Sequence, residues 1–201
     1  MRVLYFTRDY TPHDHRFLTA LAESEHTVSF LRLERRGMQR EDRPIPTAVE
    51  QIHWYGGDRP ARWQEGLRLV SSLRQVLRRV QPDVVHAGSV QTAAFLTAAV
   101  GFHPLVSMSW GSDLLKDADR SRAWRWATQF TLRRTDVLVG DCQAVADRAA
   151  EFGFPRERMV LFPWGVDLTR FSPGEAPAQR ARMGWEDAFV LLSLRAWEPL
   201  Y

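Results

Sequence analysis

Short apolar runs alternate with amphipathic stretches along most of the chain. The runs predict buried strands, and the longer amphipathic stretches between them predict helices. The expected strands cover residues 3–6, 27–33, 51–55, 83–86, 105–109, 136–139 and 158–162. The expected helices cover residues 17–23, 63–80, 91–100, 123–133 and 143–151. In the second of these helices, Leu67, Val70, Leu73, Leu77 and Val80 recur at steps of three or four residues and form one apolar face.

This alternation favours an α/β fold. Strands that are separated by helices form parallel sheets, and right-handed crossovers place the helices on both faces of the sheet. We expect a doubly wound, Rossmann-like, mostly parallel sheet of about seven strands. Ligands of such sheets bind outside the carboxyl ends of the strands, near the point where the strand order reverses. The loops that we expect to carry function are therefore residues 7–15, 55–59, 87–91, 110–113 and 141–142.

The length and composition allow one full domain and the beginning of another. The 201 residues are 45% hydrophobic, which suffices for one good core. We expect a domain over residues 1–171, a linker over 172–188, and the start of a second, truncated domain over 189–201. Residues 189–194 read as the first strand of that second domain.

The composition also limits the environment and the partners. No apolar run approaches the roughly 20 residues of a membrane-spanning helix, and the N-terminus lacks the flanks of a signal peptide, so we expect a cytoplasmic protein. Cys142 stands alone, which fits a reducing compartment. The formal charge is +3, but the arginines lie among acidic neighbours and no nucleic-acid module occurs, so nucleic acid is not an expected partner.

The loop after the first strand argues against two kinds of site. It contains no glycine, and none occurs before Gly37, which counts against the glycine-rich turn of a dinucleotide-binding fold. The sequence His13-Asp14-His15 suggests a metal site, but residues two apart do not share a helix face and no further ligand stands at a suitable spacing. Helix capping is the preferred interpretation, and we expect no metal.

The segment Ser109-Trp110-Gly111-Ser112-Asp113 follows an expected strand and precedes Leu114-Leu115. Ser112 or Asp113 is well placed to cap the next helix. The same polar groups are also well placed to face a ligand, and a glycine beside a tryptophan indicates that something packs closely there. Both interpretations stay open from the residues alone.

Several sequence motifs occur together in this chain. The most specific is Pro163-x-Gly165-Val166-Asp167, followed by Phe171-x-Pro173. The other matching segments are residues 82–87, 110–113, 153–160 and 193–195. Together, these motifs resemble the retaining glycosyltransferases of the GT-B fold, of the family-four type. The resemblance covers essentially the whole chain and implies two doubly wound domains, of which the first holds the acceptor and the second the nucleotide-sugar.

The resemblance also implies roles for particular residues. Asp113 and Trp110 would lie at the reaction centre. The implied acceptor-binding residues are Tyr10, His13, Arg16, His86, Ser89, Gly111 and Ser112. The implied donor-binding residues are Gly165, Asp167 and Arg195, the last because a guanidinium suits a diphosphate. No cofactor or metal is expected, since the nucleotide-sugar is a substrate, and the acceptor would be a sugar or a lipid-linked compound.

Two features depart from the family pattern. Many relatives carry a Gly-Gly pair in the first loop, which is absent here, and many place a histidine where Trp110 stands. A tryptophan cannot transfer a proton, although its ring can stack on a sugar.

Two rival functions stay open. One is a binding module that retains the acceptor cleft without a catalytic partner domain. The other is a sugar-nucleotide epimerase of similar architecture. The epimerase predicts phosphate contacts from the first loop, where Arg8 is the only cation before Arg16.

Two arginine-rich segments, residues 61–81 and 121–134, also carry aromatic side chains, namely Trp63, Trp124, Trp126 and Phe130. A basic, aromatic surface of this kind is typical of peripheral contact with anionic lipid. The alternative is a solvated helix face whose aromatic side chains are buried.

Overall fold

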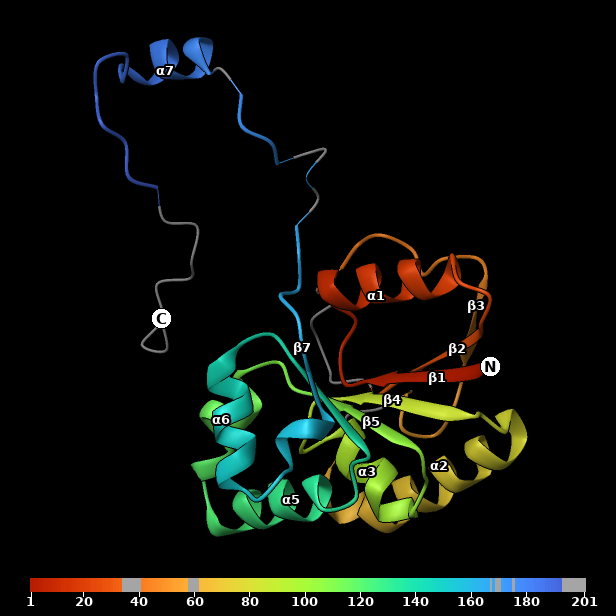
Figure 1. Ribbon diagram of the computed structural model, residues 1–201. Helices are drawn as coiled ribbons and strands as arrows, with labels where there is room; N and C mark the ends of the chain where they lie inside the picture. The colour runs from red at the N-terminus through yellow and green to blue at the C-terminus, as the bar shows by residue number, and fades with distance from the viewer. Residues whose placement is uncertain (34–40, 58–61, 167, 169–170, 175, 193–201) are drawn as a thin grey trace. The chain divides into compact units, whose positions relative to one another are not determined.

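The computed structural model describes residues 1–33, 41–57, 62–166, 168, 171–174 and 176–192 (Figure 1). The chain forms two compact units, Met1–Trp164 and Gly165–Tyr201. The first unit contains one seven-stranded sheet in which all strands are parallel. The strands are β1 (Arg2–Thr7), β2 (Thr27–Arg32), β3 (Val49–Ile52), β4 (Val84–Gly88), β5 (Leu105–Met108), β6 (Val137–Gly140) and β7 (Met159–Leu161). The predicted α/β fold class is confirmed.

The helices are distributed unequally over the two faces of this sheet. Figure 1 shows α1 on one face and α2, α3 and α5 on the other. The helices of the first unit are α1 (Pro12–Ala22), α2 (Gly66–Val80), α3 (Ala93–Val100), α4 (Ser112–Leu115), α5 (Arg122–Leu132) and α6 (Gln143–Glu151). Three short 3₁₀ helices accompany them, η1 (Trp63–Glu65), η2 (Asp117–Asp119) and η3 (Arg156–Arg158).

The strand order places the switch point between two strands that are distant in sequence. The order is β3-β2-β1-β4-β5-β6-β7, so the chain winds outward in opposite directions from β1 and β4. Tyr5 is in register with His86, and Thr7 is in register with Gly88. The loops after β1 and β4 therefore leave the sheet side by side, where α/β proteins bind ligands.

The central strands are buried on both faces, which explains why they read as continuous apolar runs, whereas the edge strands β3 and β7 are partly exposed. Leu4 and Phe6 of β1 belong to a core cluster that includes Leu73 of α2 and Ala94 of α3. Tyr5, between them, belongs to the cluster on the opposite face. Successive side chains of a strand point to opposite faces, so this central strand supplies both cores.

The prediction that residues 7–15 form a loop is wrong from Pro12 onward, because α1 begins five residues before the expected position 17. Thr11 is the N-cap, Pro12 occupies the first turn, and Asp14 completes a capping box. The Thr11 backbone N–H and hydroxyl both donate to the Asp14 carboxylate, at 2.8 and 2.5 Å. These polar residues start a helix, so the capping interpretation of His13-Asp14-His15 is confirmed.

The third strand also differs from its prediction, since β3 covers Val49–Ile52 rather than residues 51–55. Trp54 nevertheless is buried, with 5% of its surface exposed. Its indole N–H donates to the carbonyl of Arg32 at 2.8 Å, and its ring packs on Phe6. A loop tryptophan that returns to the core gives the same apolar pattern as a strand residue.

The second unit contains one helix among its described residues, α7 (Pro177–Met183), inside the segment expected to be a linker. Pro177 stands in the first turn, and Gly184 ends the helix with a left-handed backbone, at φ +67°. The expected strand at 189–194 does not form over residues 189–192. Phe189 is 94% exposed, and no described strand pairs with this segment. A strand needs a hydrogen-bonded neighbour, so the apolar run alone was insufficient. Positions 193 and 194 lie outside the described residues.

Candidate functional site

A cavity of about 650 Å³ opens at the carboxyl-terminal rim of the sheet. We call it the rim cavity. It is lined from the segments that follow β1, β2, β4 and β5 and from the first residues of α2, α3 and α5. The lining residues are Arg8, Leu33, Arg62, Gly66, Leu69, Gln91, Thr92, Phe95, Leu96, Asp117, Arg120, Ser121 and Trp124. Its place beside the β1–β4 switch point is where this fold predicts a ligand.

Asp113 connects the loops after β4 and β5. Its carboxylate is buried, with 3% of the residue exposed, and accepts hydrogen bonds from the Ser109 hydroxyl at 2.6 Å and from the backbone N–H of Val90 at 3.0 Å. The backbone N–H of Leu114 donates to it at 3.0 Å. Burial raises the pKa of this carboxyl, and the hydrogen bonds oppose that shift. The predicted role at the reaction centre stays a prediction, but these contacts make Asp113 a positioning residue for the β4 loop.

The hydrogen bonds around Asp113 continue toward the rim cavity through Gln91. The Gln91 amide donates to the Asp113 carbonyl at 2.7 Å and to the Thr128 hydroxyl of α5 at 2.8 Å. The hydroxyls of Ser89 and Thr92 share a hydrogen bond of 3.0 Å. Ser89, a predicted acceptor residue, therefore contacts a lining residue of the cavity without being one itself.

An aromatic cluster occupies the rim on the α1 side of the sheet. Trp110 lies 5.7 Å from His13 and 5.4 Å from Trp164, measured between ring centroids. Phe17 lies 5.5 Å from Trp164. The Arg16 guanidinium donates to the Trp164 carbonyl at 3.0 Å and so holds the β7 loop against α1. The rings of Trp110 and His13 pack together, so they do not face each other across an open cleft.

Two polar atoms near this cluster are buried without a hydrogen-bond partner among the described residues, Nδ1 of His13 and Oδ1 of Asp141. Burial is the main cause that lowers the pKa of His13, and Arg16 adds to it, while the negative charge of Asp141 opposes it. An unpaired buried polar atom is costly, so such atoms often mark a position where a ligand or water binds. The structure thus brings together the predicted residues Trp110, His13 and Arg16.

His86 lies beneath α1 rather than at the rim. Its ring packs edge-on against Tyr5 and Phe17, at centroid distances of 5.2 and 6.0 Å. Burial lowers the pKa of His86 to about 4, and Nε2 has no partner among the described residues. The imidazole is therefore neutral at pH 7. Its contacts are those of a core residue, and its predicted acceptor contact stays a prediction.

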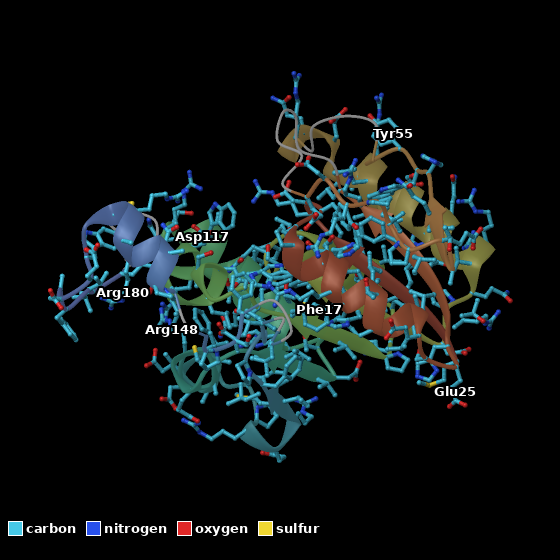
Figure 2. The ribbon with its side chains drawn as sticks, turned by 90° about the horizontal axis from the view of Figure 1, so that it is seen from above. Phe17, Glu25, Tyr55, Asp117, Arg148 and Arg180 are labelled. Carbon is cyan, nitrogen blue, oxygen red and sulfur yellow. The ribbon has the colours of Figure 1, made fainter. Side chains whose placement is uncertain are left out.

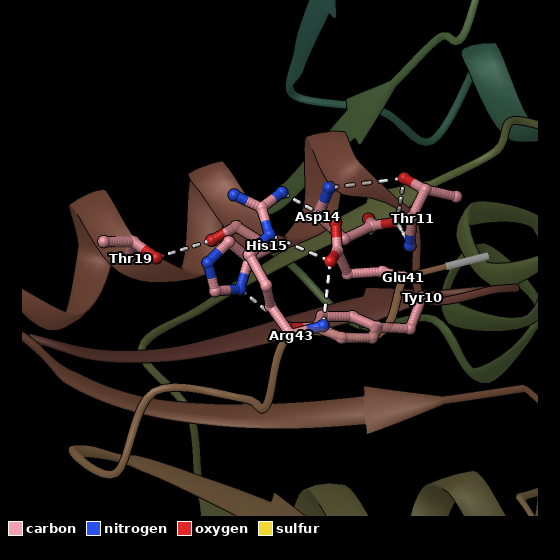
Figure 3. Close-up of polar contacts among 7 residues, drawn as sticks. All are labelled: Tyr10, Thr11, Asp14, His15, Thr19, Glu41 and Arg43. Carbon is pink, nitrogen blue, oxygen red and sulfur yellow. Dashed lines mark hydrogen bonds and ion pairs between the residues drawn. The ribbon is translucent and has the colours of Figure 1, made fainter. Parts of the chain in front are cut away.

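Tyr10 belongs to the contact between α1 and the segment before β3 (Figure 3). It is 5% exposed, and its hydroxyl and Nδ1 of His15 form a hydrogen bond of 2.9 Å. Nearby, Arg43 donates from its side chain to Glu41 at 2.9 and 2.7 Å. Tyr10 is not among the residues that line the rim cavity.

The remaining predicted residues lie in turns or outside the described part. Gly111 has φ +86° and allows the turn into α4, and Ser112 is the exposed first residue of that helix. Gly165 has φ +69° and belongs to the second compact unit. Asp167 and Arg195 lie outside the described residues. Their predicted donor contacts are untested.

Sequence reasoning did not select Arg62, Thr92, Arg120 or Trp124 as site residues, although they line the rim cavity. The signal that could have found them is their position at the start of a predicted helix after a strand. Arg120 stands more than ten residues after β5, so only the folded chain brings it to the rim. Within the described ranges, no cluster of three or more metal-ligating side chains occurs, and no described helix is long and apolar enough to cross a bilayer.

The sequence model of Glycosyltransferase Family 4 matches residues 13–170, which is most of the chain and nearly all of the domain described above. The chain belongs to Glycosyltransferase Family 4. A D-inositol 3-phosphate glycosyltransferase from Geodermatophilus obscurus is 32% identical over 100 residues, covering 49% of the chain and 22% of that relative.

Solved structures agree on the fold of this family 4 domain. Anabaena HepE in complex with UDP superimposes with a TM-score of 0.63 at 19% identity, covering 93% of the chain and 51% of HepE. The UDP-GlcNAc 2-epimerase from Neisseria meningitidis, bound to UDP-GlcNAc, gives a TM-score of 0.58 at 13% identity over 80% of the chain and 45% of the epimerase. The chain thus spans about half of these proteins and has the N-terminal domain of a GT-B fold.

Proposed function

We propose that this chain is the acceptor-binding half of an enzyme that moves a sugar from a nucleotide-sugar to an acceptor with retention of configuration. Membership of Glycosyltransferase Family 4 supports sugar transfer. The observation that carries the acceptor role is the rim cavity, whose described lining residues all belong to the first compact unit. The nucleotide-sugar would be held mainly by a second domain, with Gly165, Asp167 and Arg195 as donor contacts.

The residues around Trp110 would serve the reaction by positioning. A tryptophan cannot donate or accept the transferred proton, so its ring would stack on a sugar, and Asp113 would fix the loop that carries it. Without an acid or base at this position, the rate would come from orientation and from stabilisation of the leaving diphosphate. We expect no metal in this step and no cofactor, because the nucleotide-sugar is itself a substrate.

The test is a transfer assay on the gene product that contains this chain, run in parallel with residues 1–201 alone. UDP-sugars are offered with a panel of acceptors that includes D-inositol 3-phosphate and lipid-linked sugars. We expect transfer by the gene product, none by residues 1–201, and a product whose anomeric configuration by NMR matches that of the donor. Turnover by residues 1–201 would refute the division into halves, and an inverted product would refute retention.

The epimerase alternative rests on Arg8. This arginine lines the rim cavity, and the Neisseria epimerase shares the fold; the phosphate contact that the alternative predicts is untested. Incubation with UDP-GlcNAc and no acceptor separates the two functions, because an epimerase changes the sugar while a transferase leaves it intact. A non-catalytic binding module would bind acceptors and change neither substrate.

Peripheral membrane contact is a further part of this proposal. On α5, Trp126 is 56% exposed, and Leu115 of α4 is 47% exposed. Exposed Arg122 and Arg125 accompany them. Sedimentation with anionic and neutral vesicles at low salt tests it: we expect binding to the anionic vesicles only, and equal recovery with both would refute the contact.

A further inference from the structure

We propose that the rim cavity binds a phosphate ester carried by the acceptor. The proposal rests on the proposed function, because it specifies the acceptor's chemical class. The ligand would be a polyol or sugar phosphate, with the phosphate near the arginines and the ring against the apolar wall. The inference depends on charge, on the direction of three helices, and on the shape of the lining.

The described residues of the lining carry an excess of two positive charges. Arg8, Arg62 and Arg120 contribute guanidinium groups, and Asp117, labelled in Figure 2, contributes the one carboxylate among these residues. Arg62, Asp117 and Arg120 form no ion pair with any residue in the described part of the chain. A phosphate monoester carries nearly two negative charges at neutral pH, so it balances this lining better than a single carboxylate does. Guanidinium groups also match the geometry of phosphate oxygens.

The acidic neighbour of Arg120, Asp119, forms ion pairs with residues that do not line the cavity. Asp119 accepts from the guanidinium of Arg125 at 2.8 Å and also from that of Arg148. Arg120 instead lies over the ring of Trp124, with its guanidinium carbon 5.5 Å from the centroid. This cation–π contact keeps the guanidinium beside the cavity without neutralising its charge.

Three helices begin at the cavity wall. Gly66, Thr92 and Ser121 stand at or next to the starts of α2, α3 and α5, and all three line the cavity. None of these helices has an acidic residue in its first turn, and no side chain caps α2 or α3. Helix N-termini carry partial positive charge, so their convergence adds to the potential of the arginines. The N-cap residue of α2 is Glu65, whose carboxylate accepts from the Tyr55 hydroxyl at 2.8 Å, so α3 and α5 contribute most of this effect.

The rest of the lining suits a polyol ring. Trp124, Phe95 and Leu96 give an apolar and aromatic wall on which a ring can stack. Thr92 and Ser121 add hydroxyls that can exchange hydrogen bonds with ring hydroxyls. The Gln91 amide is already used by Asp113 and Thr128, so it serves the wall rather than the ligand.

The first test measures binding by residues 1–201, using D-inositol 3-phosphate and unphosphorylated myo-inositol in isothermal titration calorimetry. We expect the phosphate to bind at least about tenfold more tightly, since charge-assisted hydrogen bonds strengthen binding by this order. Arg8→Gln and Arg120→Gln should each weaken phosphate binding by about tenfold and leave inositol binding unchanged. Equal affinities for the two probes would overturn the proposal.

Arg78→Gln is the matched control. Arg78 is an exposed arginine near the other end of α2, is not among the lining residues, and loses the same charge. We expect it to bind the phosphate like the unchanged chain. If all three variants weaken binding equally, only net charge matters, and the cavity is not the site. Circular dichroism confirms that each variant is folded.

Two further arms identify the source of the anion. The affinities for glucuronate and glucose 6-phosphate are compared to distinguish recognition of a carboxylate from recognition of a phosphate, and we expect glucose 6-phosphate to bind more tightly.

Binding to phosphatidylinositol vesicles is compared with binding to soluble inositol phosphate, to distinguish a lipid headgroup from a free sugar phosphate. A preference for glucuronate would overturn the proposal, whereas binding of either phosphate source supports it.

The transfer assay distinguishes this proposal from the proposed function. If the gene product consumes no nucleotide-sugar while residues 1–201 still bind the phosphate through Arg120, the function fails and the site stands. If sugar is transferred equally well to inositol and to its phosphate, and Arg120→Gln leaves KM unchanged for both, the function stands and the phosphate site fails.

Discussion

The carboxyl-terminal rim of this sheet has two halves that differ in kind. The packed half, on the α1 side, is filled by the rings of His13, Phe17, Trp110 and Trp164. The open half, on the side of α2, α3 and α5, encloses the rim cavity with its arginines. Figure 2 labels one residue of each half, Phe17 and Asp117. Both halves lie beside the same switch point, yet one is closed by its own side chains and the other leaves charged side chains around an empty space.

Residues of the packed half position loops, whereas residues of the open half are available to bind a ligand. At the loop connection around Asp113, the carboxylate is satisfied by the protein itself. In the packed half, the aromatic rings fill the space against one another, and Nδ1 of His13 and Oδ1 of Asp141 have no hydrogen-bond partner among the described residues. Substitutions there should first change stability. In the open half, exposed arginines such as Arg120 contribute little packing, so substitutions there should first change binding. This contrast can be broken by experiment.

The largest effect is expected from Asp113→Ala. This change removes a buried acceptor and leaves the N–H of Val90 and the hydroxyl of Ser109 without their partner. Losing this buried acceptor should lower the free energy of unfolding by about 3 kcal/mol. Urea denaturation followed by circular dichroism measures it. Ser112→Ala, at the exposed neighbouring position, should change stability by less than about 0.5 kcal/mol. If both variants are equally stable but only Asp113→Ala loses transfer, the carboxylate acts in catalysis rather than in positioning.

The core between α1 and the sheet predicts two opposing effects of pH, one from Asp14 and one from His86. Burial raises the pKa of Asp14 to about 6. The folded state therefore holds an extra proton between about pH 4 and 6, and stability falls as pH rises through that range. Burial lowers the pKa of His86 to about 4, so the unfolded state holds the extra proton between about pH 4 and 6.5, and stability rises with pH. Each effect is about 3 kcal/mol, and they offset each other in the unchanged protein.

Single substitutions should reveal the two effects separately. From pH 4 to pH 7, the free energy of unfolding of Asp14→Asn should rise by about 3 kcal/mol more than that of the unchanged chain. Over the same range, the free energy of unfolding of His86→Leu should rise by about 3 kcal/mol less than that of the unchanged chain. Denaturation series at pH 4, 5, 6 and 7 measure the slopes. Parallel curves for all three proteins would show that neither group titrates differently in the folded state.

A smaller loss of unfolding free energy is expected from Gly88→Ala, which tests how closely the loops after β4 and β5 pack against each other. A Cβ at this position would lie 3.1 Å from the indole nitrogen of Trp110 and 3.2 Å from the carbonyl oxygen of Met108. The carbonyl belongs to the sheet and cannot move far, so the loss should be about 2 kcal/mol. Gly66→Ala is the control, because nothing lies within 4 Å of its Cβ. Thermal unfolding of both variants gives the comparison, and an unchanged midpoint for Gly88→Ala would show that Trp110 is free to move.

The fold was predictable because each buried strand is apolar on both faces. All the strands of the sheet were found, and α6 (Gln143–Glu151) has the predicted limits. The errors have local causes. The capping box at Thr11 and Asp14 resembles a polar loop in sequence, and Trp54 resembles a strand residue because it returns to the core. The apolar residues 189–192 have no paired neighbour among the described strands.

The site was predictable only where motifs lie next to a strand. The segment from Ser109 to Asp113 was selected in this way, and the structure places it at the rim. Arg62 and Arg120 were not selected, because each stands just before a predicted helix but ten or more residues after the preceding strand, and tertiary structure brings it to the rim. Whether a side chain at the rim is packed or open depends on which helix covers it, and a single sequence does not contain that information directly.

The smallest effect is expected from Arg120→Gln on stability, and it is the sharpest test of the contrast. This side chain is exposed and forms no ion pair among the described residues, so its main contact is the ring of Trp124 at 5.5 Å. Removing the charge should lower the free energy of unfolding by no more than about 1 kcal/mol, the size of an exposed cation–π contact. Urea denaturation at low salt, next to Arg78→Gln, measures it. A loss above about 1.5 kcal/mol would mean that Arg120 supports the fold, and the two halves of the rim would then not differ in kind.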